Sequence, residues 1–122
     1  MASYWKQNLD TIIDGLFDQM VGIRRHLHMN PEVSGQERQT SFYLYQLLGD
    51  QGFDVRMGPE GRGVVADSVV EGSGSARGLV ALRADIDALR IHDEKEVPYR
   101  SRCDGVMHAC GHDAHTATVF GA

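Results

Sequence analysis

Apolar residues recur at spacings of three and four along the first 28 residues of the chain. This period predicts an amphipathic helix from Tyr4 to about His28. Pro31 disfavours helical geometry at the residue before it, and the helix is therefore expected to end there. The apolar positions of the pattern are Trp5, Leu9, Ile12, Ile13, Leu16, Phe17, Met20, Val21 and Leu27.

A second helix is predicted after the proline. Ser34 is a candidate N-cap, and Glu37 three residues later completes the pattern of a capping box. The apolar face continues through Leu44, Leu47 and Leu48, and the helix is expected to end near residue 50, where glycines occur.

The period of the pattern changes from helical spacing to alternation after residue 52. Residues 53–57, "FDVRM", alternate as a half-buried strand does, and residues 63–70, "GVVADSVV", predict a second strand. A glycine- and serine-rich loop follows, and then residues 78–84, "GLVALRA", which are nearly continuous in apolar residues, predict a strand buried on both faces. The expected fold class is α/β: two helices, a sheet of about three strands and the start of a further helix near the end of the chain.

Length, charge and composition narrow the function classes. The chain has 122 residues, 42% of them hydrophobic, and a net charge of -5, values typical of one globular domain. No basic patch is dense enough to neutralise a phosphate backbone, so nucleic acid is not an expected partner. The apolar runs are far shorter than the roughly 20 residues of a membrane span, so no membrane partner is expected, and the start lacks the features of a signal peptide. A cytoplasmic location is therefore expected, in which both cysteines stay reduced.

The chemistry-bearing residues are concentrated in residues 105–117, "GVMHACGHDAHTA". Cys110 and His112 are separated by one glycine, and thiolate and imidazole are both ligands of divalent metals. Two ligands make only half a site, and the chain has no CxxC pair to complete a structural zinc module. The alternative is that Cys110 is a small buried hydrophobic residue and the histidines of the segment are polar residues at the start of a helix.

Three aspartates are candidates to orient a metal-bound imidazole, namely Asp85, Asp87 and Asp113. The first two follow the third predicted strand, where open α/β sheets place their ligands. Asp113 is equally well explained as a helix N-cap. His26 and His28 also lie close together, and here the favoured interpretation is a favourable interaction of polar groups with the dipole at a helix C-terminus.

Three motifs in this order resemble a known family: "RRHLHMNPEVSGQE" at 24–37, "ALRADIDAL" at 81–89 and "GVMHACGHDAHTA" at 105–117. They are similar to the amidohydrolase branch of the M20 metallopeptidases, which includes hippurate hydrolase-like and auxin-conjugate hydrolase-like enzymes. The resemblance spans nearly the whole chain, and its third motif is highly specific. The fold implied is the N-terminal part of a zinc-exopeptidase-like catalytic domain.

The resemblance implies hydrolysis of the amide bond of N-acyl amino acids, with two divalent metal ions (zinc, manganese, nickel or cobalt) as cofactors. Within it, Cys110 and His112 are metal ligands, and Asp87 is a catalytic-site residue beside the metals that orients a ligand. Residues 1–122 would then be the N-terminal segment of the catalytic domain, with the remaining ligands, a catalytic glutamate and a dimerisation domain downstream. The parent protein is expected to be a homodimer and this chain alone to be inactive. The rival hypothesis is a non-catalytic metal-binding or interaction module that retains the half-site.

Overall fold

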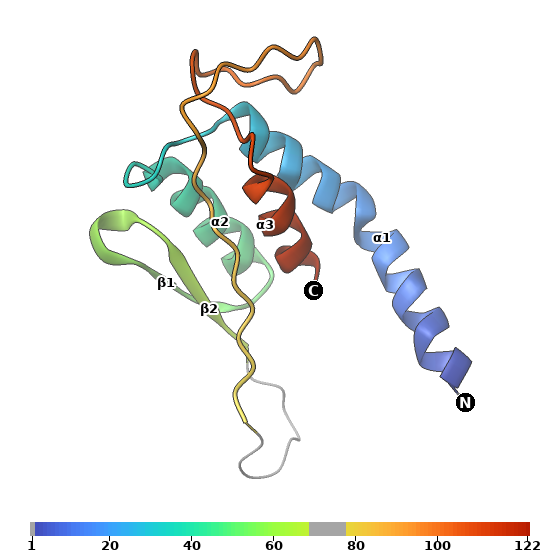
Figure 1. Ribbon diagram of the computed structural model, residues 1–122. Helices are drawn as coiled ribbons and strands as arrows, with labels where there is room; N and C mark the ends of the chain where they lie inside the picture. The colour runs from blue at the N-terminus through green and yellow to red at the C-terminus, as the bar shows by residue number, and fades with distance from the viewer. Residues whose placement is uncertain (1, 69–77) are drawn as a thin grey trace.

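The computed structural model describes residues 2–68 and 78–122. Its elements in chain order are the helices α1 (Ala2–Met29) and α2 (Arg38–Asp50), the strand β1 (Asp54–Met57), the 3-10 turn η1 (Pro59–Gly61), the strand β2 (Val64–Asp67) and the helix α3 (His112–Gly121). Figure 1 shows the two strands beside α2, and α3 beside α1. The predicted order of two helices, strands and a final helix is therefore confirmed, and with it the α/β class.

The core lies where the second half of α1 meets α3. Ile23 and Leu27 of α1 and Ala117 of α3 are buried, and Tyr43, Leu47 and Phe120 pack against them. The two helices approach closely because α3 ends in Gly121, where a Cβ atom would lie 2.5 Å from Sδ of Met20. Although α1 is long, no helix of the described residues is long and apolar enough to cross a membrane.

The start of α2 differs from the predicted capping box. The helix begins at Arg38, and the Ser34 side chain makes no capping contact with it. Instead, the carboxylate of Glu32 accepts hydrogen bonds from the first-turn amides of Gln39 and Thr40, at 3.2 and 2.5 Å. The Ser34 cap is therefore wrong, because a carboxylate further back along the chain takes over the free amides of the first turn.

The two strands form an antiparallel hairpin in which Asp54 pairs with Asp67 and Met57 with Val64. Its turn is tight: a Cβ atom at Gly58 would lie 2.0 Å from the carbonyl oxygen of Arg62, so only glycine fits there. The hairpin lies against α2 (Figure 1). The last two residues of the predicted strand 63–70 lie outside the described residues.

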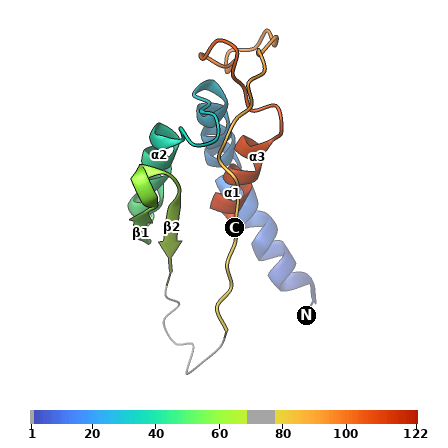
Figure 2. The ribbon, with the colours of Figure 1, turned by 60° about the vertical axis from the view of Figure 1, so that its left-hand side comes forward.

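Residues 78–84 are extended but form no strand pairing with any other described residue, which corrects the prediction of a central strand. Leu79, Val80 and Leu82 are 94%, 84% and 62% exposed. Figure 2 shows this segment as an isolated length of extended chain that rises toward α3. An apolar run predicts burial on both faces only if sheet neighbours and covering helices exist, and the described residues supply none here. Pairing starts just beyond it, at the bridges Val33–Ala88 and Leu89–Met107.

Candidate metal centre

The start of α3 places Cys110 and His112 on either side of a glycine in a left-handed conformation. Gly111 has φ 93° and precedes the first helical residue, His112. Residues with a side chain rarely adopt this backbone, so glycine is the residue that lets the chain turn from the loop into the helix at this point. The single-residue spacing noted in the sequence is thus tied to a backbone turn.

Asp87 holds one nitrogen of the His112 ring. Nδ1 of His112 lies 2.9 Å from Oδ1 of Asp87 and 3.0 Å from its carbonyl oxygen, so both partners are acceptors and Nδ1 carries the proton. In that tautomer Nε2 has a free lone pair, which is the arrangement of metal-bound imidazoles whose other nitrogen is fixed by a carboxylate. Asp85, the second aspartate of the motif, lies 3.9 Å from Nε2. The structure therefore brings Asp85 and Asp87 to His112.

Cys110 is exposed and unpaired, and its Sγ lies 4.0 Å from the carbonyl oxygen of Asp87. This exposure argues against the alternative of a small buried hydrophobic residue. A thiol and an imidazole beside the same aspartate form a donor set that suits zinc and similar divalent ions. Among residues 2–68 and 78–122, however, no three His, Cys, Asp or Glu side chains converge as a metal site requires. The residues thus fit a metal as half of its ligand set.

His108 is buried beside this half-site. The residue is 4% exposed, and neither of its ring nitrogens has a hydrogen-bond partner among the residues that the structure describes. Burial is the largest cause that lowers the pKa of His108; the nearby rings of His28 and His112 act in the same direction, and the carboxylates of Asp113 and Asp87 oppose it. Buried polar groups without a protein partner are rare in folded proteins. The third histidine of the segment, His115, has its ring 6.0 Å from that of His112.

Asp113 does not cap α3, and it does not contact His112. It is 1% exposed in the first turn, where its Oδ2 accepts a hydrogen bond from Nδ1 of His28 at 2.7 Å and forms an ion pair with Nε of Arg24 at 2.9 Å. Nε2 of His28 lies 3.1 Å from Oδ2 of Asp93. His28 lies in the last turn of α1, as expected, but the helix-end interpretation does not account for its ring, which bridges two buried carboxylates from remote parts of the chain. The spacing of His26 and His28 in the predicted helix gave no indication of these contacts with remote carboxylates.

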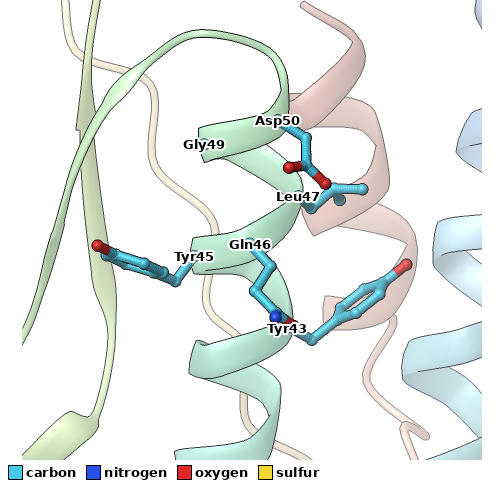
Figure 3. A pocket seen from close by; sticks show the side chains of 6 residues that line it. All are labelled: Tyr43, Tyr45, Gln46, Leu47, Gly49 and Asp50. Atoms are coloured by element: carbon cyan, nitrogen blue, oxygen red, sulfur yellow. The ribbon is translucent and has the colours of Figure 1, made fainter.

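His26 has a different environment from His28, although both lie in the last turn of α1. Its ring stacks on Tyr43 of α2 at 3.9 Å, and burial together with the charge of Arg102 lowers its pKa. An open hollow lies on α2, lined by Tyr43, Tyr45, Gln46, Leu47, Gly49 and Asp50. Figure 3 shows Tyr43 and Tyr45 pointing to opposite sides of α2. None of the residues that line this hollow belongs to the half-site, so the hollow is not the candidate metal centre.

Comparison with known proteins supports the motif-based resemblance. The model of peptidase family M20/M25/M40 matches residues 81–122, which contain Asp87, Cys110 and His112. Over 85% of this chain, the sequence is 47% identical to the N-acetyl-L-cysteine deacetylase of Bacillus subtilis. Over 95% of this chain, it is 38% identical to the N-acyl-L-amino acid amidohydrolase of Geobacillus stearothermophilus. It spans only 24% and 30% of the length of these two relatives.

The fold is likewise similar to that of solved structures. The Bacillus subtilis YXEP protein, a dinuclear metal binding peptidase from the M20 family, superposes with a TM-score of 0.77 at 37% identity, over 86% of this chain and 29% of that one. An aminohydrolase structure from methicillin-resistant Staphylococcus aureus gives a TM-score of 0.79 at 36% identity, over 94% and 30%. The resemblance to the N-terminal part of this family is therefore confirmed.

Proposed function

We propose that this M20-family chain supplies half of the metal site of a hydrolase that cleaves the amide bond of N-acyl amino acids. The relatives named above include a deacetylase and an amidohydrolase of such compounds, and one solved neighbour binds two metals. The chain spans less than a third of these proteins, so activity, substrate and metal content are proposed for the whole protein that carries it. A homodimeric assembly stays a prediction from the resemblance.

The hydrogen bond between Asp87 and His112 is the observation that carries the proposal. The carboxylate accepts the Nδ1 proton at 2.9 Å, which fixes the ring and leaves the Nε2 lone pair for a divalent ion. Cys110 acts beside it as a thiolate ligand, not as a nucleophile. Two bound ions such as zinc, manganese, nickel or cobalt supply Lewis-acid polarisation of the acyl carbonyl and a water of lowered pKa.

Metal analysis of the full-length protein tests the ligand assignment. The Cys110→Ala, His112→Ala double variant is expected to lose bound metal, and Asp87→Asn to weaken metal binding by about 10–100-fold, as is typical when the partner of a ligand is removed. Cys103→Ala and His92→Ala are matched controls, because both residues lie in the exposed part of the loop 90–104. Unchanged metal stoichiometry in the double variant would contradict the assignment.

Turnover of a panel of N-acyl amino acids tests the reaction. Full-length protein with bound metal is expected to release the free amino acid, and the double variant is not. Full metal occupancy with no turnover on any member of the panel would instead favour the non-catalytic module.

The 122-residue chain by itself is expected to bind metal weakly and to hydrolyse none of these substrates. Catalytic zinc sites use three protein ligands and a water, whereas no three His, Cys, Asp or Glu side chains converge among the described residues. Turnover by the isolated chain that survives purification and vanishes in Cys110→Ala would show that the chain is already a complete enzyme.

A further inference from the structure

The last turn of α1 contains a histidine enclosed between two carboxylates. His28 is 1% exposed, with Nδ1 at 2.7 Å from Oδ2 of Asp113 and Nε2 at 3.1 Å from Oδ2 of Asp93. Asp93 and Asp113 are themselves 2% and 1% exposed. Each ring nitrogen of His28 thus lies within hydrogen-bond distance of a different buried carboxyl group.

Other donors complete the charge balance around His28. Asp93 also accepts hydrogen bonds from the amide of Ser101 at 2.9 Å and from the backbone and ammonium nitrogens of Lys95 at 3.1 and 2.7 Å. Burial raises the pKa of Asp93, but the hydrogen bonds from Lys95 and Ser101 outweigh it and hold the pKa well below the usual range. On the other side, Nε of Arg24 lies 2.9 Å from Oδ2 of Asp113. Each buried carboxylate is thus paired with cationic donors, as burial of a charge requires.

This network joins three segments that are distant in the sequence. His28 is 85 residues from Asp113, in the first turn of α3, and 65 residues from Asp93, in the loop 90–104. Arg24 and His28 are four residues apart in α1 and therefore lie on one face, from which both contact the same oxygen of Asp113. Asp113 directly follows His112, and the ring of His112 is held by its contact with Asp87.

We propose that His28 is a positioning residue, which clamps Asp113 to Asp93 and thereby fixes the first turn of α3 and the direction of the His112 side chain. The effect on the order of α3 depends only on the fold. The effect on metal affinity rests on the proposed function of His112 as a ligand. These two consequences allow separate measurements.

The variant that tests the proposal is His28→Gln, and His26→Gln is its matched control. Glutamine has no rigid ring with which to contact both carboxylates at once. The control makes the same substitution in the same turn of α1, at a histidine that stacks on Tyr43 and touches neither aspartate. Both variants are made in the full-length protein and compared below the melting temperature of the less stable one.

Amide hydrogen exchange of the metal-free protein is the first measurement. His28→Gln is expected to speed exchange in the first turn of α3 by about tenfold or more over His26→Gln, after correction for global stability. Equal exchange in the two variants would overturn the proposal whether or not the protein binds metal.

Metal affinity is the second measurement. His28→Gln is expected to raise the dissociation constant for zinc by about 10–100-fold, while His26→Gln leaves it near that of the starting protein. A lower melting temperature with an unchanged dissociation constant would make His28 a residue of stability alone and overturn its positioning role. If the starting protein binds no zinc, the proposed function fails instead, and hydrogen exchange still decides the role of His28.

Asp93→Asn keeps the test decisive if His28→Gln does not fold. Asparagine preserves the size of the side chain but removes one of the two carboxylates that the His28 ring contacts. It is expected to change exchange in α3 and zinc affinity in the same direction as His28→Gln, by a smaller factor. No change in either measurement would overturn the proposal.

Discussion

The two halves of α1 carry the same apolar period in very different surroundings. In the first half Trp5, Leu9 and Ile12 are 62%, 45% and 57% exposed, whereas in the second half Ile23 and Leu27 are each 3% exposed. The difference is due to α3, which packs against the second half while the first half extends away from the rest of the chain (Figure 2). Periodicity therefore predicts which side of a helix is apolar, and a partner remote in sequence decides whether that side is buried.

Charged groups follow the same division. The aspartates of the first half, at positions 10 and 14, are exposed. In the second half Arg24 and His28 contact carboxylates that are almost fully buried. A buried ion pair depends on each partner in a way that a solvated charge does not. Substitutions of one residue type should thus have very different costs at the two ends of the helix.

The largest expected effect is that of removing a buried carboxylate. Asp113→Ala leaves Arg24 and His28 without their shared acceptor and should lower the free energy of unfolding by about 3–5 kcal/mol. Asp14→Ala, in the exposed half, should change it by less than about 0.5 kcal/mol. Urea unfolding of both variants measures the difference. Similar losses would mean that the network contributes no more than a solvated charge.

A smaller effect is expected from the apolar side chains of the same helix. Leu27→Ala creates a cavity in the core, and the loss should lie toward the lower end of the usual range of about 2–5 kcal/mol because the cluster is small. Leu9→Ala, at a position that is 45% exposed, should cost less than about 1 kcal/mol. Urea midpoints of the pair test this. Equal costs would show that the first half of α1 is packed in solution.

The helices were predictable from the sequence because their signals are local. The period of the apolar residues and Pro31 place α1 within a few residues of its observed bounds, and the glycines after Leu48 mark the end of α2. The environment of residues 78–84 was not predictable, because the burial of an apolar run depends on its sheet neighbours rather than on its own residues. The cap predicted for α2 was wrong for a related reason, because Glu32 reaches the first turn of α2 across a bend in the chain.

The candidate site shows the same limit. Cys110, His112 and Asp87 stood out because their residue types and spacing carry metal chemistry, and the contact between Asp87 and His112 is present. Their role as ligands stays a proposal. The network of His28 was missed because its partners lie 65 and 85 residues away, and a histidine at a helix end has an ordinary explanation. Only the packing of α1 against α3 and the loop reveals it.

Acid should weaken the buried end of α1 selectively. The folded-state pKa of Asp93 lies below its unfolded value of about 3.9, so its stabilising effect is fully present above that value and is lost as the pH falls toward the folded pKa. Urea midpoints measured from pH 7 to pH 2 should therefore drop below about pH 4. Asp93→Asn should flatten this drop, and Asp14→Asn should follow the starting protein. A drop of the same size in Asp93→Asn would assign it to other carboxylates.

The smallest expected effect comes from two glycines inside α1. A Cβ atom at Gly15 or at Gly22 meets nothing within 4 Å, so alanine fits at both and favours the helix by about 0.5–1 kcal/mol. At Gly22, in the half that packs on α3, this gain should appear in the urea midpoint, because that half unfolds with the core. At Gly15 the helix can open locally while the core stays folded, so the gain should appear mainly as extra helicity by circular dichroism. Equal gains in the urea midpoint would show that α1 unfolds as one unit, and its two halves would then differ in exposure but not in stability.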